Sequence, residues 1–226
     1  MHFYNRNNIN KIRHHILFIF NMTYVLTCDK DEVYLSRDKA NKLYLIEFKA
    51  TNPNIRIDAL LTFDIYKMIY ELNKDIFESY HIAFPDPADP SRAELLFILK
   101  SVMGLGERYT HVYTHMPHLL HQGDQREEQK GQGKNIYMIS ENIAKDAPSA
   151  LRHLIPRRAE QLDSEDSTIT IHVQPDGHVI QFYYKFKLQL NKPGDVISIP
   201  PFVDKAISTI MKNTFVRVKK FIECLG

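Results

Sequence analysis

Four histidines that lie close together in the sequence are the side chains of this chain best suited to bind a metal ion. They are His111, His115, His118 and His121. A strand would place His111 and His115 on one face, and a helix would place His111, His115 and His118 along one stripe. Because imidazole is a ligand for zinc and for iron, either geometry would suit a metal-dependent enzyme. No HExxH or paired CxxC spacing fixes a ligand set, so histidines on a polar strand face remain the alternative, and no cofactor is expected.

A second group of side chains has the composition of a nucleic-acid-binding surface. In the segment 167–190, Tyr183 is flanked by Lys185 and Lys187, with His172 and Gln181 on the same predicted face. A strand with an aromatic ring between basic residues can stack on a base and contact phosphates. An ordinary solvated sheet face has the same composition, so both interpretations stay open.

The motifs of the common enzyme classes are absent from the sequence. There is no GxSxG, P-loop or kinase signature, and Gly104 and Gly106 follow a predicted helix, where glycine acts as a helix stop. Neither Cys28 nor Cys224 lies in a recognised nucleophile motif. We therefore expect a non-enzymatic structural or protein-interaction module, a component of a larger assembly with a protein partner or a second copy of itself. Nucleic-acid binding and metal-dependent catalysis are the alternatives.

The segment Ser167–Leu190 predicts a β-hairpin, and each of its faces can be assigned. Apolar residues alternate with polar ones in both halves, the pattern of strands with one buried face. The first half buries Ile169, Ile171 and Val173, and the second buries Ile180, Phe182, Tyr184, Phe186, Leu188 and Leu190. Between them, Pro175 and Gly177 favour a tight turn.

The remaining pattern predicts an α+β fold in which antiparallel strands from both halves of the chain pack against three main helices. Further strands are expected at 24–28, 33–35, 42–49, 136–139 and 196–199, with a short helix at 146–154. The main helices are expected at 58–80, which is amphipathic, at 90–103, which is apolar nearly all round, and at 201–224.

The domain organisation is expected to be simple. Residues 1–21 form an extension, and residues 22–226 form a single domain that carries a mobile polar loop at 122–134. No apolar run approaches the roughly 20 residues that span a bilayer.

Composition adds expectations about origin and location. The chain is 44% hydrophobic with a net charge of +2, which neither demands nor excludes a nucleic-acid partner. The chain has 13 phenylalanines, 12 tyrosines and no tryptophan, and we read this usage, together with abundant isoleucine, asparagine and lysine, as that of an AT-rich genome, a viral one among them. Two cysteines favour an intracellular location, in the cytoplasm or in a host cell.

Overall fold

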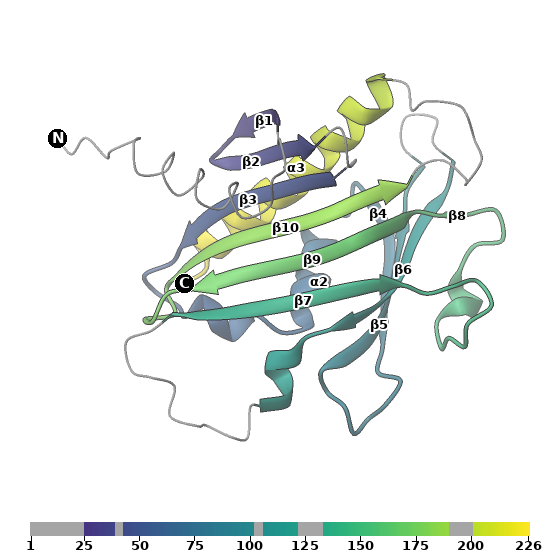
Figure 1. Cartoon of the computed structure of the whole chain (residues 1–226), viewed down its shortest axis with the longest axis horizontal. Helices are drawn as coiled ribbons and strands as arrows, with labels where there is room; N and C mark the ends of the chain where they lie inside the picture. The colour runs from purple at the N-terminus through teal and green to yellow at the C-terminus, as the bar shows by residue number, and fades with distance from the viewer. Residues whose placement is uncertain (1–24, 39–42, 102–105, 122–132, 190–200) are drawn as a thin grey trace.

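The architecture is one curved β-sheet that wraps around two helices (Figure 1). The computed structural model describes residues 25–38, 43–101, 106–121, 133–189 and 201–226. The strands follow the order β1-β2-β3-β10-β9-β7-β6-β5-β4, and neighbours are antiparallel, while the two-residue β8 pairs with β6 in parallel. Their bounds are β1 Val25–Lys30, β2 Val33–Asp38, β3 Leu43–Thr51, β4 Phe77–Ala83, β5 Arg92–Leu99, β6 Arg108–His115, β7 Lys134–Asn142, β8 Glu160–Gln161, β9 Asp163–Val173 and β10 Val179–Gln189.

The predicted hairpin is confirmed as β9 and β10. Phe182 pairs with Ile171 and Ile180 with Val173, and these four apolar side chains are buried as the alternation requires. The turn contains Gly177 at a φ of 76°, a conformation that residues with a side chain rarely adopt. The hairpin joins the two halves of the chain, because β10 also pairs with β3 along its whole length.

The predicted helix at 90–103 is wrong, because residues Arg92–Leu99 form strand β5. Six consecutive residues of β5 are buried, since both faces of the strand are covered. A short, continuous apolar run is typical of such a strand as well as of a buried helix, and periodicity alone does not separate the two.

The predicted helix at 58–80 is wrong over most of its length. The segment contains the 3-10 helix η1 (Ile57–Leu60), the nine-residue helix α2 (Asp64–Leu72) and then strand β4. Asn73 ends α2: its side-chain amide donates to the Ile69 carbonyl, and its own carbonyl accepts from the amides of Ile76 and Phe77. Asparagine competes with the helical backbone in this way. The predicted short helix at 146–154 is reduced to the 3-10 turn η3 (Arg152–Leu154).

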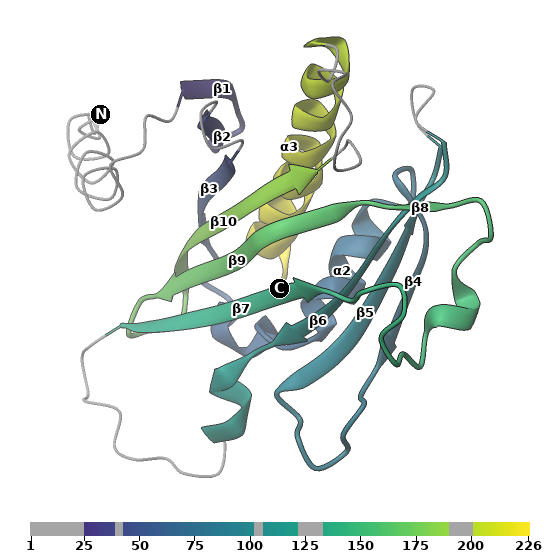
Figure 2. The same cartoon turned by 45° about the vertical axis from the view of Figure 1, so that its right-hand side comes forward.

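The third predicted main helix is confirmed as α3 (Pro201–Cys224). It packs with α2 on one side of the sheet, and the sheet curls around both (Figure 2). Phe215 of α3 contacts the rings of Phe48 and Phe182, which stack at 4.5 Å between centroids and tie the C-terminal helix to β3 and β10. With only these two α-helices among the described residues, the molecule is predominantly β, and the expected α+β fold with three main helices is corrected.

Some expectations fall on parts of the chain outside the described residues. These are the extension at 1–21, most of the polar loop at 122–134 and the strand at 196–199. A single domain over 22–226 stays a prediction. Within the described residues, no helix has the length and apolarity needed to cross a membrane.

Candidate functional site on the inner face of the sheet

The face of the sheet that turns toward α2 and α3, here called the inner face, is a nearly continuous apolar wall. It runs from β2 to β5, and helix residues such as Phe215 and Ile69 pack against it. Strand residues in the wall include Leu35, Ile46, Phe182, Ile169, Met138, Val112 and Leu95. An apolar face of this extent either forms a sealed core or surrounds an apolar ligand.

Four hydroxyl side chains interrupt this wall in the middle of the sheet, and we call them the hydroxyl row. They are Thr114 on β6, Ser140 on β7, Ser167 on β9 and Tyr184 on β10. Ser140 pairs with Thr114 on one side and with Ser167 on the other, so the three occupy one level across adjacent strands. Thr114 Oγ1 and Ser140 Oγ lie 2.9 Å apart, and Ser167 Oγ and the Tyr184 hydroxyl lie 3.3 Å apart.

Helix α2 adds a fifth hydroxyl, that of Tyr66, which is buried beside the hydroxyls of Ser140 and Thr114 but forms no hydrogen bond of good geometry with any described residue. Burial raises the pKa of Tyr66 to about 12, and the hydroxyls of Ser140 and Thr114 beside it offset part of that rise. The phenol is therefore neutral and can donate or accept a hydrogen bond. Most buried polar side chains in proteins have a partner, so an unpaired phenol needs an explanation.

Part of the hydroxyl row remains accessible to solvent. Thr114 and Ser167 are buried, with Tyr66 of α2 beside Thr114 and Ser140. Ser140 and Tyr184 remain half-buried although both lie on the inner face. Around these two side chains the central strands are well covered, because Met138 and Ile171 are fully buried, so the accessible polar surface is local to Ser140 and Tyr184.

One of the predicted metal ligands, His118, contacts the loop that precedes α2. It lies in the 3-10 helix η2 (Pro117–His121), where its Nε2 donates to the Leu61 carbonyl at 2.9 Å. Burial lowers the pKa of His118, so the ring is neutral, and its buried Nδ1 has no hydrogen-bond partner among the residues that the structure describes.

The structure does not bring the described histidines together. His111 and His115 share one face of β6, as the strand interpretation predicts, but this is the opposite, outer face of the sheet. His111 is buried there and its Nε2 donates to Glu94 Oε1 at 2.7 Å. No group of three or more His, Cys, Asp or Glu side chains gathers within the described residues. The side chain of His121 lies outside them, so the histidine metal site stays a prediction.

The predicted nucleic-acid-binding residues do lie together on the outer face of the hairpin, but they are engaged with neighbouring side chains. Lys187 Nζ contacts Glu165 Oε2 at 2.5 Å, and His172 Nδ1 lies 2.9 Å from Asn135 Oδ1. Burial, followed by the charge of Glu47, raises the pKa of Tyr183 to about 12. Gln181 and Lys185 complete this face, opposite His172 and Thr168 of β9.

Sequence reasoning did not select any member of the hydroxyl row. Tyr184 was assigned to the buried side of the hairpin, and Tyr66 falls within the predicted first helix. The sequence does contain one signal for this group, namely a hydroxyl side chain at a strand position where the alternation predicts an apolar residue. That signal becomes useful only when β6, β7 and β9 are known to be adjacent.

Comparison with known proteins identifies the fold. No family model matches the sequence, and no curated protein matches it either. Among solved structures, the human StarD13 (DLC2) lipid transfer and protein localization domain is similar with a TM-score of 0.62, 13% identity and coverage of 98% of this chain and 100% of that one. Human StAR-related lipid transfer protein 5 has a TM-score of 0.57 and 10% identity over 96% of this chain and 95% of that chain. A STAR-related lipid transfer protein fragment from Xanthomonas axonopodis has a TM-score of 0.54 and 12% identity over 88% and 98%.

These similarities correct several expectations from the sequence. The similar structures are of human and bacterial proteins named for lipid transfer, so a structural or interaction module and a nucleic-acid-binding protein are no longer supported. The expected AT-rich or viral origin is likewise unsupported. The curved antiparallel sheet closed by a long C-terminal helix is the helix-grip fold of these START-type lipid-transfer structures.

Proposed function

We propose that this chain binds an apolar, lipid-like molecule between the inner face of the sheet and helix α3. The observation that carries this proposal is the hydroxyl row together with the unpaired phenol of Tyr66 in an otherwise apolar wall. A ligand with a polar end and an apolar body would satisfy the phenol and cover the apolar side chains around it. The fold supports the proposal, since three structures with the same architecture are named for lipid transfer.

The energetics favour such a ligand. Each square ångström of apolar surface removed from water contributes about 25 cal/mol, so an acyl chain or ring system supplies most of the affinity. A hydrogen bond to Tyr66 removes the cost of leaving its hydroxyl buried without a partner, about 1–3 kcal/mol. The apolar wall therefore provides affinity, and the hydroxyl row provides orientation.

The proposal is tested first by looking for the ligand. Native mass spectrometry of the purified chain, followed by organic extraction, is expected to show one lipid-sized molecule bound per chain. Because a lipid can be lost in purification, the same experiment is repeated after incubation with mixed lipid vesicles. A chain that takes up no apolar molecule in either experiment contradicts the proposal.

A matched pair of variants on β7 tests where the ligand lies. Ser140→Trp fills space on the inner face and is expected to reduce lipid uptake at least tenfold, because a bulky ring excludes the ligand from the space beside Tyr66. Tyr137→Trp adds a similar ring on the exposed outer face of the same strand and is expected to leave uptake unchanged. Circular dichroism confirms that both variants fold. Equal uptake by the two variants places the ligand elsewhere.

An intracellular location and association with a protein partner or a second copy are also proposed. Sparse cysteines support the location. Tyr137 and Ile139, two large exposed side chains on the outer face of β7, support association. Cell fractionation and light scattering test these points, and a monomer that captures no protein contradicts the second.

A further inference from the structure

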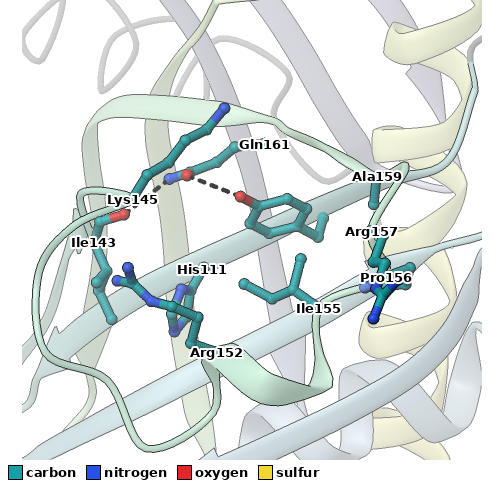
Figure 3. Close-up of a pocket in the computed structure, with 10 residues that line it drawn as sticks. His111, Ile143, Lys145, Arg152, Ile155, Pro156, Arg157, Ala159 and Gln161 are labelled. Carbon is teal, nitrogen blue, oxygen red and sulfur yellow. Dashed lines mark hydrogen bonds between the residues drawn. The ribbon is translucent and has the colours of Figure 1, made fainter.

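A second pocket lies on the outer face of the sheet, away from the hydroxyl row. It is an open depression bordered by β6 and by residues 143–161, here called the strap, which comprise the β7–β8 connection with β8 and fold over β5 and β6 (Figure 3). Its volume is about 270 Å³. A pocket of this size has room for several water molecules or for a small organic molecule.

A buried carboxylate holds the strap in place. Glu94 of β5 is 1% exposed and accepts hydrogen bonds from the side chains of His111 and Ser149 and from the backbone amides of Ala150 and Leu151. Burial acts to raise the pKa of Glu94, but these donors together lower it below its ordinary value. Four donors on one buried carboxylate fix the strap to the sheet, so the pocket is preformed.

The floor of the pocket is apolar, and its polar groups are mutually satisfied. Ile143, Ile155 and the ring of Tyr109 contribute apolar surface. The Tyr109 hydroxyl donates to Gln161 Oε1 at 3.3 Å, and Gln161 Nε2 donates to the Ile143 carbonyl at 3.2 Å (Figure 3). The floor therefore favours an apolar group and carries no formal charge.

The charged residues that line the pocket are all cationic. They are Lys145, Arg152 and Arg157, and no carboxylate lines the pocket with them. Lys145 and Arg157 are exposed and form no ion pair within the described chain, whereas Arg152 donates to the carbonyls of Ala144 and Ala147. In Figure 3, Lys145 and Arg152 lie on the side of Ile143 and Arg157 on the opposite side, so cationic groups border the apolar floor on both sides.

We infer that the strap pocket is a second binding site, for a small molecule with a compact apolar body and one carboxylate or phosphate group. The apolar body would rest on Ile143, Ile155 and Tyr109. The anionic group would lie at the edge of the pocket near Lys145 or Arg157, where it remains partly hydrated. A ligand of this size is far smaller than a lipid, so the two sites take different molecules.

Benzoate and phenyl phosphate are suitable probes, with methyl benzoate as the uncharged control. Titrated into the full chain at low ionic strength, each anion is expected to shift the backbone amide NMR signals of Ile143, Ile155 and Gln161. Methyl benzoate is expected to bind more weakly and without salt dependence, because it lacks the charge that the edge residues attract. Comparing the two anions determines whether a carboxylate or a phosphate is preferred.

Variants separate this site from the inner face. Lys145→Gln with Arg157→Gln is expected to weaken benzoate binding about tenfold, since each exposed charge contributes modestly. Ala159→Phe, which fills the pocket, is expected to abolish binding. Lys67→Gln on the exposed face of α2 removes one positive charge away from the pocket and is the control for the general effect of surface charge. Tyr66→Phe should leave benzoate binding unchanged.

Three results overturn the inference. The first is the absence of any shift at the strap amides up to about 10 mM benzoate, a concentration at which even weak binding of a ligand of this size is detected. The second is equal binding of benzoate and methyl benzoate. The third is a set of shifts at Tyr66 and Ser140 in place of the strap. The last result would assign the anion to the inner face and leave the proposed lipid site standing.

Discussion

The two faces of strand β6 carry opposite kinds of polar chemistry. On the outer face His111 meets Glu94, whose carboxylate accepts four hydrogen bonds. On the inner face Thr114 belongs to a group of uncharged hydroxyls, one of which, on Tyr66, is buried and forms no hydrogen bond of good geometry within the described part of the chain. A saturated buried group stabilises the fold, whereas an unsaturated one indicates a missing partner. The first group therefore has a structural role, and the second is the basis of the proposed ligand site.

The largest expected effect comes from removing the outer carboxylate. Glu94→Ala leaves the donors of His111, Ser149, Ala150 and Leu151 buried without their acceptor, and should lower the free energy of unfolding by about 3 kcal/mol. Urea denaturation measures this loss. Glu71→Ala, which removes an exposed ion pair with Lys74, is the matched control and should have no measurable effect. Equal stability of the two variants would show that the strap is not held by Glu94.

The same carboxylate predicts a dependence of stability on pH. The folded-state pKa of Glu94 is lower than the ordinary value of 4.5, so the folded state binds its proton less readily than the unfolded state does. The contribution of ionised Glu94 to the free energy of unfolding is therefore fully present above pH 4.5, and it is lost as the pH falls through the lower pKa that Glu94 has in the folded state. The difference in stability between the wild type and Glu94→Gln should shrink in that acidic range. A constant difference down to pH 2 would contradict this assignment.

Smaller effects on stability are expected from replacing a serine by alanine on each face of the sheet. Ser149→Ala removes a donor to Glu94 and an acceptor for the amides of Leu151 and Arg152, and should cost about 1–2 kcal/mol with no change in lipid binding. Ser140→Ala should cost about 1 kcal/mol, because Thr114 Oγ1 loses its partner at 2.9 Å, and should in addition weaken lipid binding. Urea denaturation and lipid titration of both variants measure the free energy of unfolding and the lipid affinity of each. The reverse pattern would exchange the roles assigned to the two faces.

The sequence pattern predicted the elements whose burial depends on residues close by in the sequence. The hairpin of β9 and β10 followed from alternation and a glycine turn, and helix α3 followed from its amphipathic stripe. Strand β5 was missed because its burial on both faces depends on the strap, which lies some fifty residues further along the chain. The helix predicted at 58–80 was too long, because the hydrogen bond from the Asn73 side chain that ends α2 does not interrupt the apolar periodicity of the sequence.

The candidate site could not be predicted for a related reason. Its hydroxyls come from α2 and from four strands that become adjacent only through the pairing of β6, β7, β9 and β10. The histidines attracted interest because they are close in sequence, yet the strand places His111 on the outer face while η2 directs His118 to Leu61. Proximity in sequence was therefore a poor guide to proximity in the fold.

The most direct test of the proposed lipid site is a titration of the wild type, Tyr66→Phe and Tyr70→Phe with a fluorescent neutral lipid, combined with unfolding of each chain without ligand. Tyr70 is the matched control, because it lies on the same helix and its hydroxyl has only a long contact, 3.4 Å, with the Glu78 carbonyl. We predict that Tyr66→Phe binds the lipid at least fivefold more weakly while its ligand-free stability is equal or higher, since it loses a buried hydroxyl that forms no hydrogen bond of good geometry with the described residues. Unchanged lipid affinity in Tyr66→Phe, or a loss of stability without ligand, would contradict the assignment of this hydroxyl to a bound molecule.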